Sequence, residues 1–332
     1  QYNISPEKIL GVKSSGVSVT KMLSNQTPLA HLKTEGACIT PNGAMFKNDS
    51  QGFLPEMMET MYNERVIYKK RMLKAKREYE KTKDPKLVKE ISRCHNIQWA
   101  RKIALNSAYG AVGNQYFRYY DVRQASGITT AGQFIIRFIE SKVNEYLNRI
   151  LQTHDKIDYI VASDTDSIYV TLDKLVEKTC EGKTNDQICN FIDKVVGSRI
   201  EPFLEKCFGE LSDYTNAFKN CMVMKREVIA DKGIWVAKKR YMLNVLDEEG
   251  VRLSEPKLKL MGIEAVKSST PQVCRGKIKE AIKIIMSKEQ SDLHKFVADF
   301  KKEFLQMSAE QISFPRSCNN IRKYKDHSNV FI

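Results

Sequence analysis

With 332 residues, of which 42% are hydrophobic, the chain is long enough for two domains or for one domain with a large insertion. No run of about 18 apolar residues occurs, so the sequence predicts no membrane-spanning helix. An excess of 54 Lys and Arg over 40 Asp and Glu gives a net charge of +14, which indicates a polyanionic partner, with nucleic acid as the first candidate. The eight cysteines show no C-x-x-C spacing, which disfavours a zinc site or a disulfide framework and favours reduced thiols in a cytoplasmic protein.

A basic segment runs from Glu64 to Lys102, with fourteen Lys and Arg, five acids and no Gly. Asp84-Pro85 predicts a turn followed by a helix with Pro at its first position, so we expect antiparallel helices over 55–81 and 86–111. Arg65 and Lys102 then lie level at the base of this hairpin, and Lys69 lies one turn above Arg65. Three cations at the base of the hairpin could together bind a cluster of phosphate groups. The lysines nearer the turn are explained more simply as the solvated surface of a charged hairpin.

The second helix carries Lys102, Asn106, Tyr109 and Gly113 at helical spacing, so these residues share one face. Such a stripe is a poor protein core but a good nucleotide surface. The cation meets phosphate, the ring offers a flat face and the glycine permits close backbone approach.

A short acidic turn follows further along the chain. Apolar and β-branched residues flank Asp164-Thr165-Asp166-Ser167, which predicts a β-hairpin with Asp164 and Asp166 at its tip. Two carboxylates on a rigid element suit Mg2+, although Asp is also common in ordinary turns. A two-metal site needs another carboxylate, for which Glu227 in the strand-like run 224–230 is a candidate, while Asp247 and Glu249 are interpreted as a structural hairpin turn.

Three motifs in this order resemble family B DNA polymerases. Lys102-x-x-x-Asn106-Ser107-x-Tyr109-Gly110 resembles the fingers motif, Asp164-Thr165-Asp166-Ser167 the palm motif, and Lys238-Lys239-Arg240-Tyr241 the primer-binding motif of that family. Further stretches resemble the T-even bacteriophage branch: Asn3-Ile4-Ser5-Pro6, Phe117-Arg118-Tyr119-Tyr120-Asp121 and Lys267-Ser268-Ser269-Thr270-Pro271. The resemblance covers essentially the whole chain.

The resemblance implies template-directed addition of dNTPs to a primer 3′ end by two-metal phosphoryl transfer. By this resemblance, Asp164 and Asp166 would be the catalytic carboxylates. Asp166 would coordinate both Mg2+ ions, and Glu227 would lie near the metal site. Arg65, Lys69 and Lys102 would grip the incoming triphosphate, and Asn106 and Tyr109 would line the nascent base pair. Lys238, Lys239, Arg240 and Tyr241 would contact the primer-template DNA.

The sequence departs from the family pattern in three places. Ala162-Ser163 stands where Tyr-Gly usually precedes the acidic motif, and Val66 stands where the phage branch often has a cation. The first metal-binding Asp motif of the family is not found after Gln1. We therefore expect a fragment, inactive alone, whose partners include an upstream polypeptide with that motif and an exonuclease domain, and a sliding clamp bound through a C-terminus absent here.

The expected architecture is α+β, a palm sheet with a helical-hairpin fingers insertion and the start of a helical thumb. The expected domains are palm 1–52, fingers 53–113, palm 114–255 and thumb 256–332. Strands are expected near 158–172, 221–231, 234–247 and 251–259. Helices are expected at 116–150, 190–208, 272–288 and 292–305.

Two other functions use the same features. A two-metal nuclease would need a second catalytic acid within the chain and would not need the stripe from Lys102 to Tyr109. A non-catalytic nucleic-acid-binding module would need only the basic surface. If the protein is viral, its expected location is the cytoplasm of the host cell.

Overall fold

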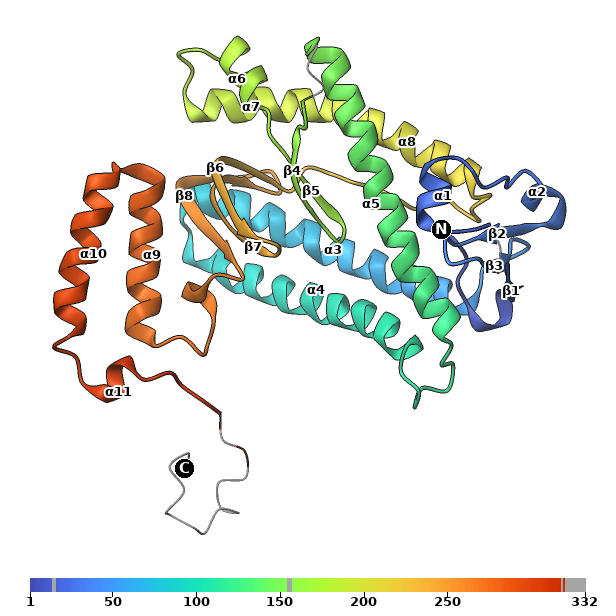
Figure 1. Cartoon of the computed structure of the whole chain (residues 1–332), viewed down its shortest axis with the longest axis horizontal. Coiled ribbons are helices and arrows are strands. Elements are labelled where there is room, and N and C mark those ends of the chain that lie inside the picture. Colours follow the sequence, from blue (N-terminus) through green and yellow to red (C-terminus); the bar gives the residue numbers. More distant parts are fainter. Residues whose placement is uncertain (14–15, 154–156, 318, 320–332) are drawn as a thin grey trace. The chain divides into compact units, whose positions relative to one another are not determined.

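The computed structural model describes residues 1–13, 16–153, 157–317 and 319, and it contains helices and small antiparallel sheets, as the α+β prediction requires (Figure 1). Two compact units divide the chain: Gln1–Ile229 with Asp247–Ser254, and Ala230–Leu246 with Glu255–Ile332. No helix among the described residues is both long and apolar enough to cross a lipid bilayer.

The first unit begins with a three-stranded antiparallel sheet of order β1-β3-β2. Its strands and the short helices around them are η1 (Pro6–Lys8), β1 (Ile9–Val12), α1 (Val19–Leu23), α2 (Leu32–Glu35), β2 (Ala37–Ile39) and β3 (Ala44–Lys47). Every residue of β2 is buried, and Ile39 and Phe46 are fully inaccessible, so this small sheet is one side of the main core.

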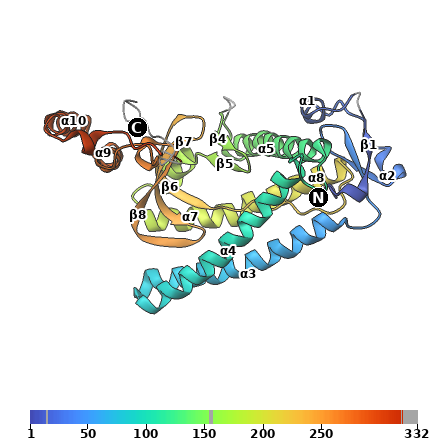
Figure 2. The same ribbon diagram turned by 90° about the horizontal axis from the view of Figure 1, so that it is seen from below.

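Two long helices follow, α3 (Phe53–Thr82) and α4 (Pro85–Val112), and they lie side by side in both views (Figures 1 and 2). Pro85 is at the start of α4, and the Asp84 carboxylate accepts from the backbone N–H of Lys86 at 2.9 Å. Lys83 ends α3 in the left-handed conformation, with φ of 54°. The predicted hairpin is therefore confirmed, and each predicted helix end lies within two residues of the observed one.

The start of α3 is capped by the segment before β1 rather than by its own N-cap, Gly52. Glu7 accepts from the backbone N–H of Phe53 at 2.8 Å, and the Ser5 hydroxyl accepts from that of Leu54 at 3.4 Å. Desolvation raises the pKa of Glu7, but the hydrogen bonds from Ser5 and Phe53 outweigh it and lower this pKa below its usual value. Asn3 accepts from the Gly52 N–H at 2.8 Å, so the Asn-Ile-Ser-Pro stretch fixes where the helical hairpin leaves the sheet.

Helix α5 (Val122–Leu151) runs through the core of the first unit. Buried residues at helical spacing, including Phe134, Ile139, Val143 and Leu147, pack with the small sheet and with α8. The helix begins six residues later than expected, because Asp121 caps it by accepting from the Arg123 N–H at 2.9 Å.

The hairpin of β4 (Ile160–Asp164) and β5 (Ser167–Val170) packs on α5. The helices after it are α6 (Asp173–Thr179), α7 (Asn185–Val195), the π-helical turn η2 (Val196–Ile200) and α8 (Glu201–Tyr214). The predicted helix at 190–208 is thus a longer run that begins at 185 and ends at 214.

The strands from β4 onward were expected to form one sheet, but they form two, because β4 and β5 pair only with each other. With β1-β3-β2, the described residues therefore contain three sheets. The third sheet has the order β6-β7-β8, with β6 (Val228–Ala237), β7 (Arg240–Glu248) and β8 (Val251–Met261). The expected strand at 221–231 and the break near 232 are wrong. Residues 221–227 form no ladder, β6 continues past Gly233, and the turn falls at Lys238-Lys239, where Lys239 adopts φ of 61°.

The second unit contains most of this sheet together with η3 (Glu264–Val266), α9 (Gln272–Ser287), α10 (Gln290–Phe304) and α11 (Ala309–Ile312). Helices α9 and α10 lie side by side, and both predicted helices are confirmed (Figure 1). The core is small: Met242, Ile263, Ile282 and Met286 are its largest buried members. Such a core leaves little stability to spare.

We predict that Gly262→Ala destabilises the second unit by at least about 2 kcal/mol, measured by thermal unfolding. Gly262 has φ of 64°, and an added Cβ would lie 2.3 Å from the Lys239 carbonyl oxygen. The matched control is Gly276→Ala within α9, where a Cβ meets nothing within 4 Å and Ala gains about 0.5–1 kcal/mol of helix propensity. Equal effects of the two substitutions would contradict this account of Gly262.

Candidate functional site

The acidic turn is the tip of the β4–β5 hairpin, which confirms the predicted location of Asp164 and Asp166. Asp164 pairs with Ser167 across the antiparallel ladder, and Thr165 and Asp166 form the loop. Asp166 is exposed and Asp164 is half-buried. The tip therefore presents one carboxylate fully to solvent and a second one beside it.

The backbone of this loop is tight and strained. The Asp166 N–H donates to the Asp164 carbonyl, two residues earlier, at 2.7 Å. Thr165 between them has φ of 57°, and these two features are those of the rare classic γ-turn. A β-branched residue at positive φ costs on the order of 1–3 kcal/mol and persists only where its surroundings enforce it. The Thr165 hydroxyl also donates to the Asp164 carboxylate at 2.9 Å, which restrains that side chain.

The donor set of the turn suits a hard cation but is incomplete. Carboxylate oxygens are the ligands that Mg2+ prefers, and Mg2+ is often held by only one or two of them. Among the described residues, no group of three or more His, Cys, Asp and Glu side chains is placed to hold a metal ion. The residues present therefore fit one side of a metal site, with further ligands required for two ions.

Glu227 lies just before β6, in the segment that forms no ladder. Its carbonyl accepts from the backbone N–H of Glu249 at 2.6 Å. Arg226, the residue before it, is anchored by ion pairs to Asp193 and Asp247. Glu227 is thus held by its neighbours and by the β7–β8 turn rather than by a sheet.

The base of the helical hairpin brings the predicted cations to one level. Arg101 on α4 pairs with Glu64 on α3 at 2.8 Å. Arg65 and Lys102, the neighbours of this pair in the antiparallel hairpin, therefore lie within about one helical turn of the same level. Arg65 is half-buried, and its Nε has no hydrogen-bond partner among the described residues. An unpaired buried donor calls for an explanation, and a bound anion is one that a guanidinium suits.

The other two cations have contacts. Lys102 is exposed, and its Nζ lies 5.5 Å from the centroid of the Trp99 ring. Lys69 forms an ion pair with Glu249 in the turn between β7 and β8, and both side chains are about one-quarter exposed. The sequence interpretation treated Glu249 as structural only and missed this contact, for which residues 180 positions apart give no local signal.

The stripe on α4 faces solvent, as its composition predicts. Lys102, Asn106, Tyr109 and the C-cap residue Gly113 are all exposed, while Cys94, Gln98 and Val112 make the buried side of the helix. This surface is therefore open to a ligand.

Aromatic residues after α4 extend this surface, of which Phe117, Tyr119 and Tyr120 entered the sequence interpretation only as part of the family resemblance. Tyr116 is 88% exposed. Phe53 and Phe117 both contact the Tyr119 ring, at centroid distances of 5.3 and 5.7 Å, and Arg118 lies over it. Exposed rings interleaved with arginine are suited to stacking with nucleic-acid bases.

The second unit carries the Lys238-Lys239-Arg240-Tyr241 motif at the β6–β7 turn. Lys238 and Lys239 are exposed. Arg240 donates to both carboxylate oxygens of Glu264, at 2.5 Å each, and Tyr241 is 6% exposed with its ring 6.1 Å from that of Trp235. The motif thus presents two lysines at a turn whose base is fixed by an ion pair and a ring contact.

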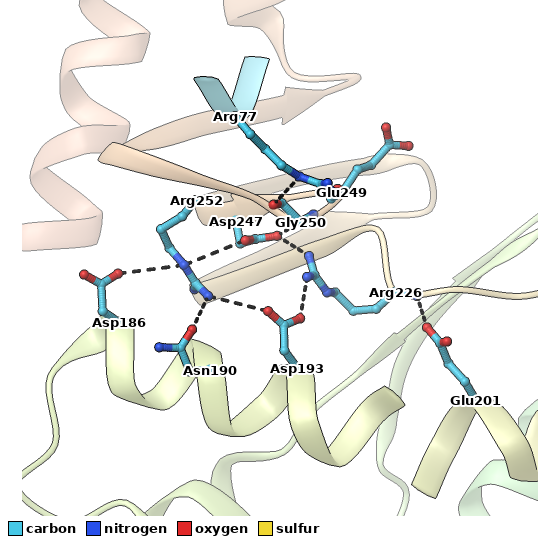
Figure 3. A network of polar contacts seen from close by, with 10 residues as sticks. All are labelled: Arg77, Asp186, Asn190, Asp193, Glu201, Arg226, Asp247, Glu249, Gly250 and Arg252. Atoms are coloured by element: carbon cyan, nitrogen blue, oxygen red, sulfur yellow. Dashed lines mark hydrogen bonds and ion pairs between the residues drawn. The ribbon is translucent and has the colours of Figure 1, made fainter. Parts of the chain in front are cut away.

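An ionic network fixes the turn that holds Glu249 (Figure 3). Asp247, whose side chain is 2% exposed, pairs with Arg226 and Arg252 and accepts from the Gly250 N–H at 2.9 Å. Asp193 on α7 pairs with the same two arginines. The interpretation of Asp247 as a structural turn residue is confirmed.

Comparisons with known proteins agree with these motifs. A family model described as DNA polymerase family B matches residues 1–325. The DNA-directed DNA polymerase of Escherichia phage RB69 is 36% identical to the chain over 375 aligned residues, which cover 98% of the chain and 41% of the phage protein. That of Enterobacteria phage T4 is 33% identical, with the same coverage. A DNA polymerase of Pyrococcus glycovorans is 26% identical over 72% of the chain and 26% of its own length. The chain spans about two-fifths of the length of the phage relatives.

Proposed function

The chain belongs to the family B DNA polymerases, and we propose that it provides the nucleotidyl-transfer region of a phage-type replicative DNA polymerase. The observation that carries this proposal is the family match over residues 1–325, together with the strained hairpin that presents Asp164 and Asp166. Primer 3′-hydroxyl attack on the α-phosphate of a dNTP, with pyrophosphate as the leaving group, is the proposed reaction.

The carboxylates of Asp164 and Asp166 would hold Mg2+, with Glu227 close to the site. Bound Mg2+ would neutralise charge that develops on the phosphate oxygens. The role of the chain itself is to fix these carboxylates, and the Thr165 hydroxyl supports this role by its hydrogen bond to Asp164. A further metal-binding Asp is proposed to come from elsewhere in a longer polymerase, because no described residue, Glu227 included, completes a group of three metal ligands with the pair.

The base of the α3–α4 hairpin is the proposed triphosphate site. The guanidinium of Arg65, the ammonium of Lys69 and the exposed ammonium of Lys102 would bind phosphate oxygens. Asn106 and Tyr109 would face the nascent base pair, since both are exposed on the same helical face as Lys102.

Primer-template DNA is the proposed partner of the Lys238-Lys239-Arg240-Tyr241 turn. Lys238 and Lys239 would contact backbone phosphates, which contribute most of such affinity. Arg240 and Tyr241 would orient this turn, because Arg240 pairs with Glu264 and Tyr241 is almost fully buried.

The finer assignments follow from the family and are proposals as well. Residues 53–113 would be the fingers, 1–52 and 114–255 the palm, and 256–332 the start of the thumb. An upstream exonuclease region and a sliding clamp would be partners, and the cytoplasm of the host cell would be the location.

We predict that Lys102→Ala raises KM for dNTP in primer extension by about tenfold, with a smaller effect on kcat, because it removes one charge-assisted phosphate contact. The matched control is Lys89→Ala on the same helix, where the exposed lysine lies near the far end of the hairpin. If both variants raise KM equally, the effect comes from general positive charge and the proposed triphosphate site is wrong.

A further inference from the structure

Glu249 occupies a turn position that disfavours it. Glu249 and Gly250, between β7 and β8, have φ of 53° and 76°, the two positive values of a type I′ turn. Asn, Asp and Gly are the usual residues at such positions, because larger side chains are strained at positive φ. A strained residue that the fold retains points to a role for its side chain.

The side chain of Glu249 reaches α3. Its carboxylate pairs with the Lys69 ammonium, and the Arg77 guanidinium donates to the Glu249 carbonyl at 3.3 Å and to the Gly250 carbonyl at 3.0 Å. The turn is therefore bound to α3 by one side-chain contact and by separate backbone contacts. Only the former involves a cation of the proposed triphosphate site.

The turn does not depend on the Glu249 carboxylate for its shape. Asp247 accepts from the Gly250 N–H and is itself held by Arg226 and Arg252 (Figure 3). The Glu249 N–H donates to the Glu227 carbonyl. Replacing the Glu249 carboxylate by an amide should thus remove one charge and leave the backbone in place.

We propose that Glu249 is a positioning residue of the triphosphate site, which holds the Lys69 ammonium in the ligand-free chain and competes with polyphosphate for it. This inference rests on the role proposed for Lys69. A polyphosphate and the Glu249 carboxylate are both anionic, so each weakens the attraction of the other for one ammonium. The carboxylate keeps Lys69 ordered, and its negative charge lowers the affinity of the site for polyphosphate.

The test is a double-mutant cycle on the 332-residue chain, with inorganic tripolyphosphate as the ligand and calorimetry as the readout. We expect Glu249→Gln to tighten binding by about three- to fivefold, the upper part of the range for the loss of one partly exposed ionic competitor. Lys69→Met should weaken binding, and Glu249→Gln should have no further effect in the Lys69→Met background. Glu78→Gln, which removes an exposed acid of α3, is the matched control and should leave the affinity within about twofold of wild type.

Each other outcome overturns the inference in a distinguishable way. Unchanged or weaker binding by Glu249→Gln, in a chain whose melting temperature is unchanged, means that the carboxylate does not compete with the ligand. If Glu249→Gln still tightens binding in the Lys69→Met background, the Glu249 charge acts on the ligand by long-range electrostatics and not through Lys69. If wild type binds tripolyphosphate but Lys69→Met binds it equally well, the triphosphate role proposed for Lys69 fails, and the inference fails with it.

Discussion

We expect Asp166→Ala to reduce primer extension by on the order of 10³-fold or more, because it removes the exposed carboxylate of the strained turn, where metal ions are proposed to bind. The hairpin itself should persist. Its ladder is formed by Asp164 and Ser167 and the residues before and after them, and the tight contact at the tip uses only the Asp166 backbone N–H. The measurement is the single-turnover rate of extension with Mg2+, in a mixture that supplies the family's first metal-binding Asp motif on a second polypeptide.

The matched control for this prediction is Asp173→Asn, which neutralises an exposed acid at the start of α6. It should change the rate by less than about twofold, since a distant surface charge is screened. A rate for Asp166→Ala within tenfold of wild type would show that Asp166 is not a metal ligand. Circular dichroism of both variants separates loss of chemistry from loss of fold.

The second large effect concerns stability. Asp247→Ala should lower the free energy of unfolding by about 3 kcal/mol, because it leaves Arg226 and Arg252 without their shared, almost fully buried acid. Asp193 still pairs with both arginines, which keeps the loss below the upper end of the range for broken buried ion pairs. Urea unfolding followed by far-UV circular dichroism measures the change.

Two control variants test whether the loss of stability in Asp247→Ala comes from the buried ion pairs. Glu90→Ala breaks an ion pair with Arg93 on the exposed face of α4 and should cost less than about 1 kcal/mol. The double variant Arg226→Met/Asp247→Leu should cost less than the sum of its single changes, because it removes both charges together. A cost for Asp247→Ala below about 1 kcal/mol would contradict the view that the network fixes the β7–β8 turn.

The parts of the fold that could be predicted from the sequence are those with local signals. The end of α3 and the start of α4 follow from Asp84-Pro85. The start of α9 and most of α10 follow from helical periodicity alone. The β4–β5 hairpin was recognisable because two β-branched runs flank an acidic turn.

The features that the sequence prediction placed wrongly or missed each have a physical cause. The turn at Lys238-Lys239 lacks Gly, Asn and Asp, so nothing in the sequence marked it, whereas Lys232-Gly233 imitates a turn but lies within β6. The capping of α3 by Ser5 and Glu7, and the ion pair between Lys69 and Glu249, depend on tertiary folding across 46 to 180 residues. Local patterns carry no information about such pairs.

For the candidate site too, local patterns predicted some features, and others depend on groups that the sequence pattern does not reveal. The residue types and spacing of Asp164, Asp166 and the α4 stripe indicated chemistry. The structure bears out the exposure of Asp166 and of the stripe and, for the two carboxylates, their shared hairpin tip. The metal, triphosphate and primer roles of these residues stay predictions, since they depend on ligands and on a further carboxylate. The family match supports these roles without testing any one residue.

The most direct measurement is template-directed extension of a labelled primer, with each dNTP offered singly against each of the four template bases. The chain would be tested alone and with a second polypeptide that supplies the missing Asp motif. We expect no extension by the chain alone, and addition of only the complementary nucleotide once that polypeptide is present. Extension without regard to the template base, shortening of the primer, or no reaction in any combination would contradict this expectation. The second result would favour a nuclease, and the third would favour a non-catalytic nucleic-acid-binding module.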